Sequence, residues 1–301
     1  MPVSPPPLPR GTLAIAIPSH NRARMLARIV GEILPTCEAL QVDVCVSDNG
    51  SSDDTPAVCA DLARASRAFR FRRFDPGIPL EEHLVAAMEP SGAEYTWAIG
   101  DDDFVFPDAL VEVARVLAEG RPSAIVTNTA EVDGDGSVNL GVPVLPQLAR
   151  FAPPSFGPRR RHRDAAAFFG EKFYNLPLRT VVYRTRDELS SDYARYYGTF
   201  HPHIGGLFDY LAKEQGERGE VDIVEIPETC TVSLTVMHDK GKTRWSNLFE
   251  HLGRVGFPRW FSLLPPLYAP HIEAGLAYHR HIFRHVLDEE NLEPRDAHRD
   301  E

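Results

Sequence analysis

Short apolar runs alternate with longer amphipathic segments along the first 130 residues of the chain. Each apolar run has the length of a buried strand, whereas the segments between the runs repeat apolar residues at helical spacing. This pattern predicts strands at 12–18, 42–46, 70–74, 95–99 and 123–127, and helices at 22–34, 56–68, 80–88 and 107–119. Because helices separate consecutive strands, we expect βαβ units and a mainly parallel sheet, which is an α/β fold.

The pattern is less regular in the second half of the chain. Residues 143–163 are rich in proline and arginine and predict a surface loop, in which the cluster 159–163 is more simply a solvated basic segment than a site for phosphate or an anionic lipid. Helices are expected at 164–173, 202–213 and 245–255, and a strand at 221–226 that ends at Pro227. The aromatic stretch 260–268 and the helix after it are expected to pack in the core or in a dimer.

Composition excludes several classes of protein. The 301 residues are 43% hydrophobic and 25% charged, which is ordinary for a globular protein with one large domain or one domain and an extension. The net charge of −11 argues against a nucleic-acid partner. No apolar run has the length of a membrane span, and residues 1–10 predict a disordered lead-in. The four cysteines have no metal-binding spacing and are expected to be reduced thiols in a cytoplasmic protein.

Polar residues follow three of the predicted strands at the point where each strand ends. Asn21 follows the first strand, Asp48 ends the second, and Asp101 follows the fourth. Ligands of open parallel sheets bind beyond the carboxyl ends of the strands. The sequence therefore predicts that these three residues share one site.

Three consecutive aspartates, Asp101, Asp102 and Asp103, carry the clearest chemical signal. Adjacent carboxylates repel one another, which suggests that a cation binds there. Mg²⁺ and Mn²⁺ prefer oxygen ligands and share their coordination shell with substrate phosphates. The triplet thus predicts a divalent metal, Mn²⁺ or Mg²⁺, that holds a diphosphate. A solvated acidic turn that caps the following helix is the alternative.

The order and spacing of three motifs resemble the family 2 glycosyltransferases of the GT-A fold. The motifs are the segments 17–22, 46–55 and 100–103, and the Gly-Asp-Asp-Asp form of the last is similar to abequosyltransferase-like bacterial sugar transferases. The resemblance covers roughly residues 13–128. It implies a Rossmann-like GT-A sheet flanked by helices, with a nucleotide-sugar-binding half at 11–130, an acceptor-binding half at 131–240 and a helical C-terminal extension at 241–301.

The resemblance assigns roles to residues of a donor pocket. Asp48 would accept a hydrogen bond from the nucleotide base, with Asn49 beside it. Asp101 and Asp103 would contact the donor ribose and the metal, usually with the later aspartate on the metal, and Asp102 could take either role. The loop that lines the pocket would consist of Pro18, Ser19, His20, Asn21 and Arg22.

One segment departs from the family pattern. The family more often has an asparagine before the glycine of the donor-binding segment, where this chain has Asp75-Pro76-Gly77. An Arg-Asn pair usually follows, where this chain has Glu82-His83. Gly77 is still expected to contact the donor. The contacts of this segment with the diphosphate are expected to differ from those that the family pattern implies.

The resemblance also implies an inverting displacement with one general base on the acceptor side. A carboxylate often opens a helix at this place in the family, so Asp209 is the first candidate, and His203 is the second because the helix is expected to begin near Pro202. A structural role is the alternative for both. His238 is a candidate third metal ligand or diphosphate contact, against the simpler interpretation of a loop histidine.

The sequence as a whole predicts a metal-dependent glycosyltransferase that moves a sugar from a nucleotide-diphosphate sugar to an acceptor hydroxyl. The acceptor would be a glycan, a lipid-linked sugar or a small natural product. Peripheral association with the inner membrane face and a homodimer through the C-terminal helices are further expectations. A nucleotidyltransferase is disfavoured because no glycine-rich basic loop follows the first strand, and a non-catalytic GT-A-like binding module is disfavoured by the intact Asp101–Asp103 triplet.

Overall fold

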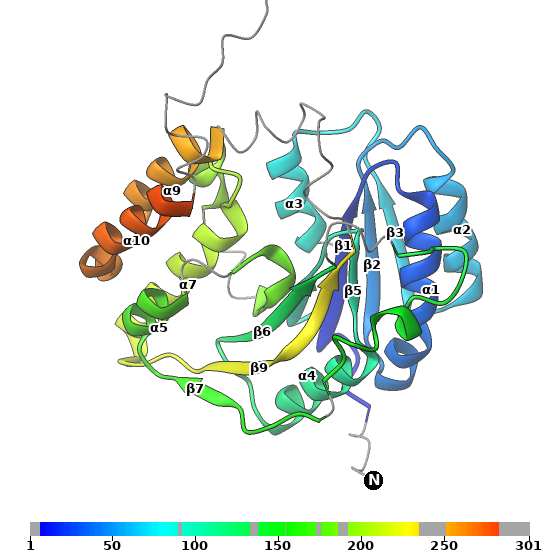
Figure 1. Cartoon of the computed structure of the whole chain (residues 1–301), viewed down its shortest axis with the longest axis horizontal. Coiled ribbons are helices and arrows are strands. Elements are labelled where there is room, and N and C mark those ends of the chain that lie inside the picture. Colours follow the sequence, from blue (N-terminus) through cyan, green and yellow to red (C-terminus); the bar gives the residue numbers. More distant parts are fainter. Residues whose placement is uncertain are drawn as a thin grey trace, which may run out of the picture.

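One mixed sheet organises the protein (Figure 1). The computed structural model describes residues 7–89, 92–132, 138–153, 155–172, 176–185, 192–234 and 251–282. The strand order is β3-β2-β1-β4-β8-β6-β9-β5, with β7 paired to β9. The strands are β1 (Leu13–Ser19), β2 (Asp43–Asp48), β3 (Phe69–Arg73), β4 (Tyr95–Ala98), β5 (Asp103–Val105), β6 (Ala124–Glu131), β7 (Arg160–His162), β8 (Val181–Tyr183) and β9 (Ile223–Ser233).

Helices cover both sides of this sheet. Figure 1 shows α1 and α2 on one side of strands β1 to β3, with α3 on the other. The helices are α1 (Ala23–Leu40), α2 (Thr55–Ala65), α3 (Leu80–Met88), α4 (Pro107–Glu119), α5 (Ala165–Lys172), α7 (Pro202–Arg218), α9 (Phe257–Leu263) and α10 (Ala269–Ile282). Short helical turns are η2 (Leu145–Leu148), η3 (Leu178–Thr180), η4 (Tyr193–Tyr196), η5 (Leu252–Gly256) and η6 (Pro266–Tyr268).

The N-terminal half of the sheet is parallel, as the sequence predicts. β1 pairs with both β2 and β4, and β2 pairs with β3, all in parallel. The register places Ser19 opposite Asp48, and Asp48 opposite Arg73. The last residues of three neighbouring strands therefore lie in one row at the carboxyl edge of the sheet.

The other half of the sheet is mixed, because β8 lies antiparallel between β4 and β6. β9 runs parallel to β6, and both β5 and β7 pair with it in antiparallel fashion. The prediction that this strand ends at Pro227 was wrong, since β9 continues to Ser233. A shift of the β6–β9 register between Thr127 and Thr129 leaves Pro227 unpaired, and a bulge of this kind tolerates a residue without an N–H.

The predicted surface loop at 143–163 is mostly exposed or half-buried, and it contains the short turn η2 and the three-residue strand β7. The basic cluster is paired with acidic side chains. Arg159 forms ion pairs with Glu112 and Glu119, and Arg161 with Asp222. Arg159 and Arg161 are thus paired with carboxylates, and Arg160, Arg161 and Arg163 remain exposed.

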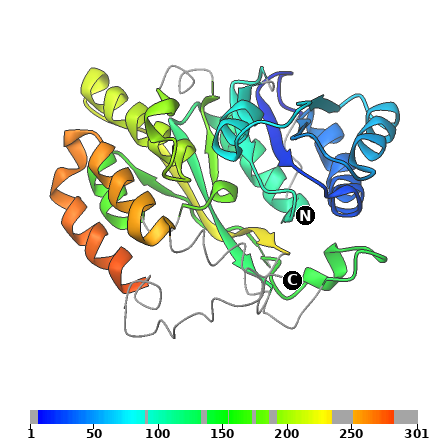
Figure 2. The same cartoon turned by 90° about the horizontal axis from the view of Figure 1, so that it is seen from above.

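A second, aromatic core lies under the C-terminal helices. Trp260 and Phe261 are 2% exposed and Tyr268 is fully buried, and they pack with Phe169 of α5 and Phe208 of α7. Figure 2 shows α9 and α10 beside α5 and α7, far from α1 and α2. The aromatic stretch therefore packs in the core, which is the expected alternative to a membrane contact.

Several predictions concern segments that lie partly outside the described residues. Leu8, in the predicted lead-in, is buried and donates its N–H to the carbonyl of Leu40 (3.0 Å), so the prediction of disorder was wrong for this residue. Most of the predicted helix 245–255 and all of His238 lie outside the described residues. The four cysteines are buried free thiols. Within the described ranges, every helix is too short or too polar to cross a bilayer.

Candidate active site

A row of polar side chains crosses the carboxyl edge of the parallel strands. Ser19, Asp48 and Arg73 are neighbours across β1, β2 and β3. Oγ of Ser19 donates a hydrogen bond to Oδ2 of Asp101 (2.8 Å), in the turn that follows β4. The structure therefore brings together three of the predicted donor-site residues, Ser19, Asp48 and Asp101, and adds Arg73 at the end of the row.

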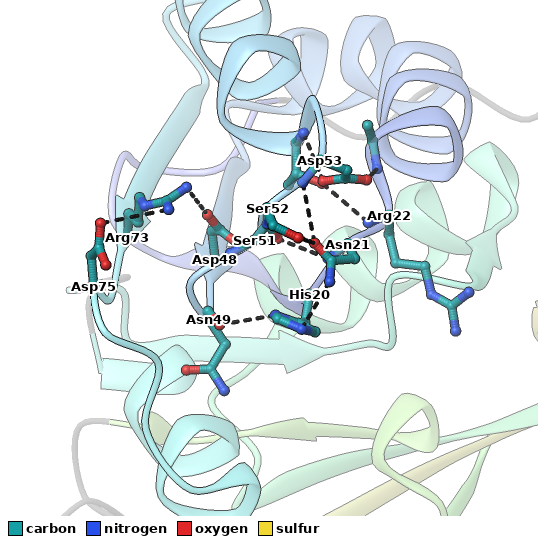
Figure 3. Close-up of polar contacts among 12 residues, drawn as sticks. His20, Asn21, Arg22, Asp48, Asn49, Ser51, Ser52, Asp53, Arg73 and Asp75 are labelled. Carbon is teal, nitrogen blue, oxygen red and sulfur yellow. Dashed lines mark hydrogen bonds and ion pairs between the residues drawn. The ribbon is translucent and has the colours of Figure 1, made fainter. Parts of the chain in front are cut away.

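Asn21 ties the loop after β1 to the loop after β2 (Figure 3). Its N–H donates to Oγ of Ser51 (2.8 Å), and its Oδ1 accepts from the N–H of Ser52 (2.7 Å). Asn21 has a φ of 55°, a left-handed conformation that asparagine tolerates better than most residues. His20 is held in the same way, with Nδ1 2.9 Å from the carbonyl oxygen of Asn49. The two loops thus form one framework.

Asp53 fixes the first turns of two helices to this framework. Its Oδ2 accepts from the N–H of Ala23 in α1 (3.1 Å), and its Oδ1 accepts from the N–H of Thr55 in α2 (3.0 Å). Burial alone would raise the pKa of Asp53, but the hydrogen bonds from Thr55 and Ala23 lower it overall. The carboxylate therefore stays charged at the positive ends of both helices.

The carboxylate of Asp48 is enclosed. Its side chain has no exposed surface. Oδ1 accepts hydrogen bonds from the N–H and the hydroxyl of Ser51, and Oδ2 accepts from Nη1 of Arg73 (3.0 Å). The predicted contact between Asp48 and a nucleotide base would therefore require Arg73 or Ser51 to move.

Asn49 and Gly77 hold the loop between β3 and α3. The amide of Asn49 donates to the carbonyl of Ile78 (2.9 Å) and accepts from its N–H (2.8 Å). A Cβ at Gly77 would lie 2.7 Å from the carbonyl oxygen of Asn49, so only glycine allows the two backbones to approach this closely. Both predicted donor-site residues thus fix the path of this loop, Asn49 through its side-chain amide and Gly77 through its close backbone approach.

The three aspartates of the triplet differ in environment. Burial raises the pKa of Asp101 to about 6, and Nε of Arg22 lies 3.7 Å from its Oδ1. Asp103 is more deeply buried, with its Oδ2 accepting from the N–H of Gly100 (2.8 Å), and burial raises its pKa to about 7. Asp102 is only half-buried.

Two of these carboxylates converge above Gly100. A Cβ at Gly100 would lie 2.7 Å from Oδ1 of Asp102 and 2.9 Å from Oδ2 of Asp103. Such oxygens suit a hard divalent cation, which commonly takes one or two carboxylates and fills its shell with phosphate oxygens. No group of three acidic, histidine or cysteine side chains in the described ranges could hold a metal alone. A cation here would complete its shell with oxygen atoms from water or from a bound diphosphate.

Arg179 contacts the last aspartate of the triplet, and no sequence motif predicted this contact. Its Nε lies 3.7 Å from Oδ1 of Asp103 and donates to Oγ1 of Thr129 (2.8 Å). Its Nη2 donates to Glu131 (2.9 Å), and its carbonyl accepts from the indole N–H of Trp97 (2.9 Å). An isolated arginine between strands carries no motif, so only the fold reveals this contact.

Glu81, in the first turn of α3, joins the donor side to the start of α7, and it was also missed. Its carboxylate accepts from the N–H of Gly198 (2.6 Å) and from the N–H of Phe200 (2.5 Å). Phe200 has a φ of 62°, which is strained for a bulky residue. The loop before α7 is thus held in one shape by a side chain from the other half of the protein.

The candidate bases lie in or after the first turn of α7. Oδ1 of Asp209 accepts from the hydroxyl of Tyr196 (2.9 Å) and from Nη2 of Arg195 (2.5 Å), and burial raises its pKa to about 6. His203 is 4% exposed, and its ring nitrogens have no hydrogen-bond partner among the described residues. Burial lowers the pKa of His203 to about 3, which keeps the ring neutral.

Comparison with known proteins assigns the chain to a family. A model described as glycosyl transferase family 2 matches residues 14–171, a segment that contains all three motifs. The chain belongs to glycosyl transferase family 2. This family assignment favours sugar transfer over nucleotidyl transfer. It also confirms the resemblance on which the donor-site prediction depends.

One curated relative within reach of sequence comparison is abequosyltransferase RfbV of Salmonella typhimurium. It is 27% identical over 108 residues, which are 35% of this chain and 32% of that protein. The match thus spans about a third of the relative's length.

Solved structures establish the fold. S. aureus TarS 1–349 in complex with UDP-GlcNAc superposes with a TM-score of 0.61 at 14% identity, over 94% of this chain and 76% of that chain. The mannosyltransferase PcManGT from Pyrobaculum calidifontis, in complex with GDP-Man and Mn²⁺, gives a TM-score of 0.56 at 15% identity, over 95% and 75%. At such identities the similarity concerns the fold alone, and that fold is GT-A, as predicted.

Proposed function

We propose that this family 2 protein is a metal-dependent glycosyltransferase that moves a sugar from a nucleotide-diphosphate sugar to an acceptor hydroxyl with inversion. The observation that carries the proposal is the hydrogen bond between Ser19 and Asp101. It joins the acidic triplet to the last residue of β1 at the sheet edge where ligands of α/β proteins bind. A relative and a neighbour of this fold are named for sugar transfer, which supports the same activity.

The donor's diphosphate is proposed to lie against the triplet and Arg22. The guanidinium of Arg22 is 43% exposed and 3.7 Å from Asp101, so it can also reach a phosphate oxygen. Asp102 and Asp103, whose carboxylate oxygens converge above Gly100, would hold the divalent metal. When bound, such a metal neutralises charge that develops on the leaving diphosphate.

The proton of the acceptor hydroxyl is proposed to go to Asp209. Tyr196 and Arg195 hold one carboxylate oxygen, Oδ1, and thereby orient the group. A base works best when its pKa lies near the operating pH, and the pKa of about 6 for Asp209 meets this condition better than the pKa of about 3 for His203. The acceptor itself is proposed to be a glycan, a lipid-linked sugar or a small natural product.

The test is release of nucleoside diphosphate from a panel of nucleotide sugars with Mn²⁺. Asp102→Asn is expected to lose at least about a hundredfold of this turnover, since it removes a charge that would hold the metal. Asp108→Asn is the matched control, because Asp108 is an exposed aspartate in the first turn of α4. Full Mn²⁺-dependent turnover by Asp102→Asn, or no consumption of any nucleotide sugar by the wild type, would overturn the proposal.

A further inference from the structure

Arg73 closes the place where the resemblance puts the base-binding carboxylate. Asp48 and Arg73 are the last residues of β2 and β3, and the parallel register sets them side by side. Nη1 of Arg73 donates to Oδ2 of Asp48 (3.0 Å), and the Asp48 side chain has no exposed surface. A buried carboxylate is costly unless paired, so this ion pair is held firmly in the fold. Both carboxylate oxygens of Asp48 therefore already accept hydrogen bonds from other groups of the protein.

Arg73 then becomes the group that faces outward at this end of the row. Its side chain is 30% exposed. A guanidinium has five N–H donors, and the bond to Asp48 uses one of them. Nη2 of Arg73 lies 3.6 Å from Oδ2 of Asp75, whose side chain is 74% exposed (Figure 3). The surface therefore offers neighbouring donors on Arg73 followed by an acceptor on Asp75.

The length of the row suits a nucleotide. It runs from Asp101, after β4, across β1 and β2 to Arg73 at the end of β3. Three strand spacings correspond to about 14 Å. An extended nucleoside diphosphate has about this length, so a diphosphate at the triplet places its base beside Arg73 and Asp75.

We propose that Arg73 and Asp75 read the nucleotide base and select cytosine or guanine over uracil, thymine and adenine. This inference rests on the proposed function, in which this edge of the sheet binds a nucleotide donor. Arg73 acts here as a specificity-determining residue, and Asp48 acts through it by fixing the guanidinium. The side chain of Asn49 is engaged with Ile78 and leaves this role to the arginine.

The selection follows from the order of polar atoms on the bases. Cytosine presents O2, N3 and its amino group, and guanine presents N7, O6 and N1–H, which in both cases is acceptor, acceptor, donor. Uracil and thymine present O2, N3–H and O4, which is acceptor, donor, acceptor. Adenine also alternates, with N7, its amino group and N1. Only the acceptor, acceptor, donor order of cytosine and guanine matches two donors on Arg73 followed by an acceptor on Asp75.

The test is calorimetric titration of the full chain with CDP, GDP, UDP, dTDP and ADP, each with Mn²⁺. CDP or GDP is expected to bind at least about tenfold more tightly than the other three, because a bidentate arginine contact discriminates bases by this order. Binding of UDP, dTDP or ADP as tightly as CDP and GDP would overturn this inference alone. No binding of any of the five would overturn the proposed function as well.

Arg73→Lys provides the variant, since it keeps the charge beside Asp48 and removes the planar fork. The preference for CDP or GDP is expected to fall below about threefold, while a thermal melt shows that the chain still folds. Arg70→Lys is the control, because Arg70 lies on the same strand and pairs with Asp43 (3.1 Å) at the opposite end of β2. An unchanged preference in Arg73→Lys would contradict the assignment. If that variant fails to fold, the wild-type series alone decides.

Discussion

Replacing Glu81 by glutamine tests whether one side chain of α3 fixes the loop before α7. The carboxylate accepts from the N–H groups of Gly198 and Phe200, at 2.6 Å and 2.5 Å. Glutamine keeps one acceptor oxygen and turns the other into an NH₂ group that cannot accept. One of the two backbone N–H groups is therefore left without its partner.

The size of the effect follows from the two hydrogen bonds and the strain that they oppose. Hydrogen bonds to a charged group contribute about 1.5–3 kcal/mol each, so the clamp supplies roughly 3–6 kcal/mol. Phe200, at a φ of 62°, costs about 1–3 kcal/mol. In Glu81→Gln a single neutral bond of about 1 kcal/mol remains, which no longer exceeds the strain. We therefore expect the loop to lose its fixed conformation.

Hydrogen exchange read by mass spectrometry on a peptide spanning 198–201 measures this directly. A loss of about 2–5 kcal/mol corresponds to exchange roughly 30- to 5000-fold faster in this segment. Glu82→Gln is the control, because Glu82 is the exposed neighbour in the same helical turn. Affinity for the nucleotide should not change. Equal protection in the Glu81 and Glu82 variants would refute the reasoning.

Three further predictions concern the site and its supports. Gly100→Ala should weaken Mn²⁺-dependent nucleotide binding at least about tenfold in calorimetry, because its Cβ would lie 2.7 Å from Oδ1 of Asp102; unchanged affinity would count against convergence of the carboxylates. Asp53→Ala should lower the free energy of unfolding in urea by about 1–2 kcal/mol, since the hydrogen bonds to the N–H groups of Ala23 and Thr55 are lost, and no change would show that these bonds are dispensable. Burial raises the pKa of Asp209 to about 6, so the protonated carboxyl contributes its full share of stability below about pH 4, and this share is lost as the pH rises through 6. Turnover should rise over the same range, because the carboxylate that acts as the base then forms. Asp209→Asn should reduce the difference between the free energies of unfolding measured in urea at pH 4.5 and pH 7.5, and it should abolish most turnover. If turnover keeps its pH dependence in this variant, Asp209 is excluded as the base.

The parallel half of the fold was predictable because its strands and helices have strong, separate periods. The strands missed were β5, β7 and β8, each of three residues, which is too short to show alternation. β5 was hidden further because it begins at Asp103, within the acidic triplet. Its position depends on pairing with β9, more than a hundred residues later in the chain.

Site residues that sit in local motifs could be found from the sequence, whereas their partners could not. Ser19 and Asp101 stand at strand ends, and a parallel sheet must bring such ends together. The pairing of Arg73 with Asp48 depends on the exact register of β2 and β3, which the apolar pattern does not specify to one residue. The contact of Glu81 with the loop before α7 joins distant segments through the fold alone.

An anomalous difference map from a crystal grown with Mn²⁺ and the nucleoside diphosphate that binds most tightly tests the proposed donor site without reference to turnover. The proposed function predicts a manganese peak beside Asp102, with the diphosphate on that ion and next to Arg22, and the role proposed for Arg73 predicts the base beside it. A manganese ion away from the triplet, or a nucleotide bound elsewhere on the protein, would contradict the proposed function.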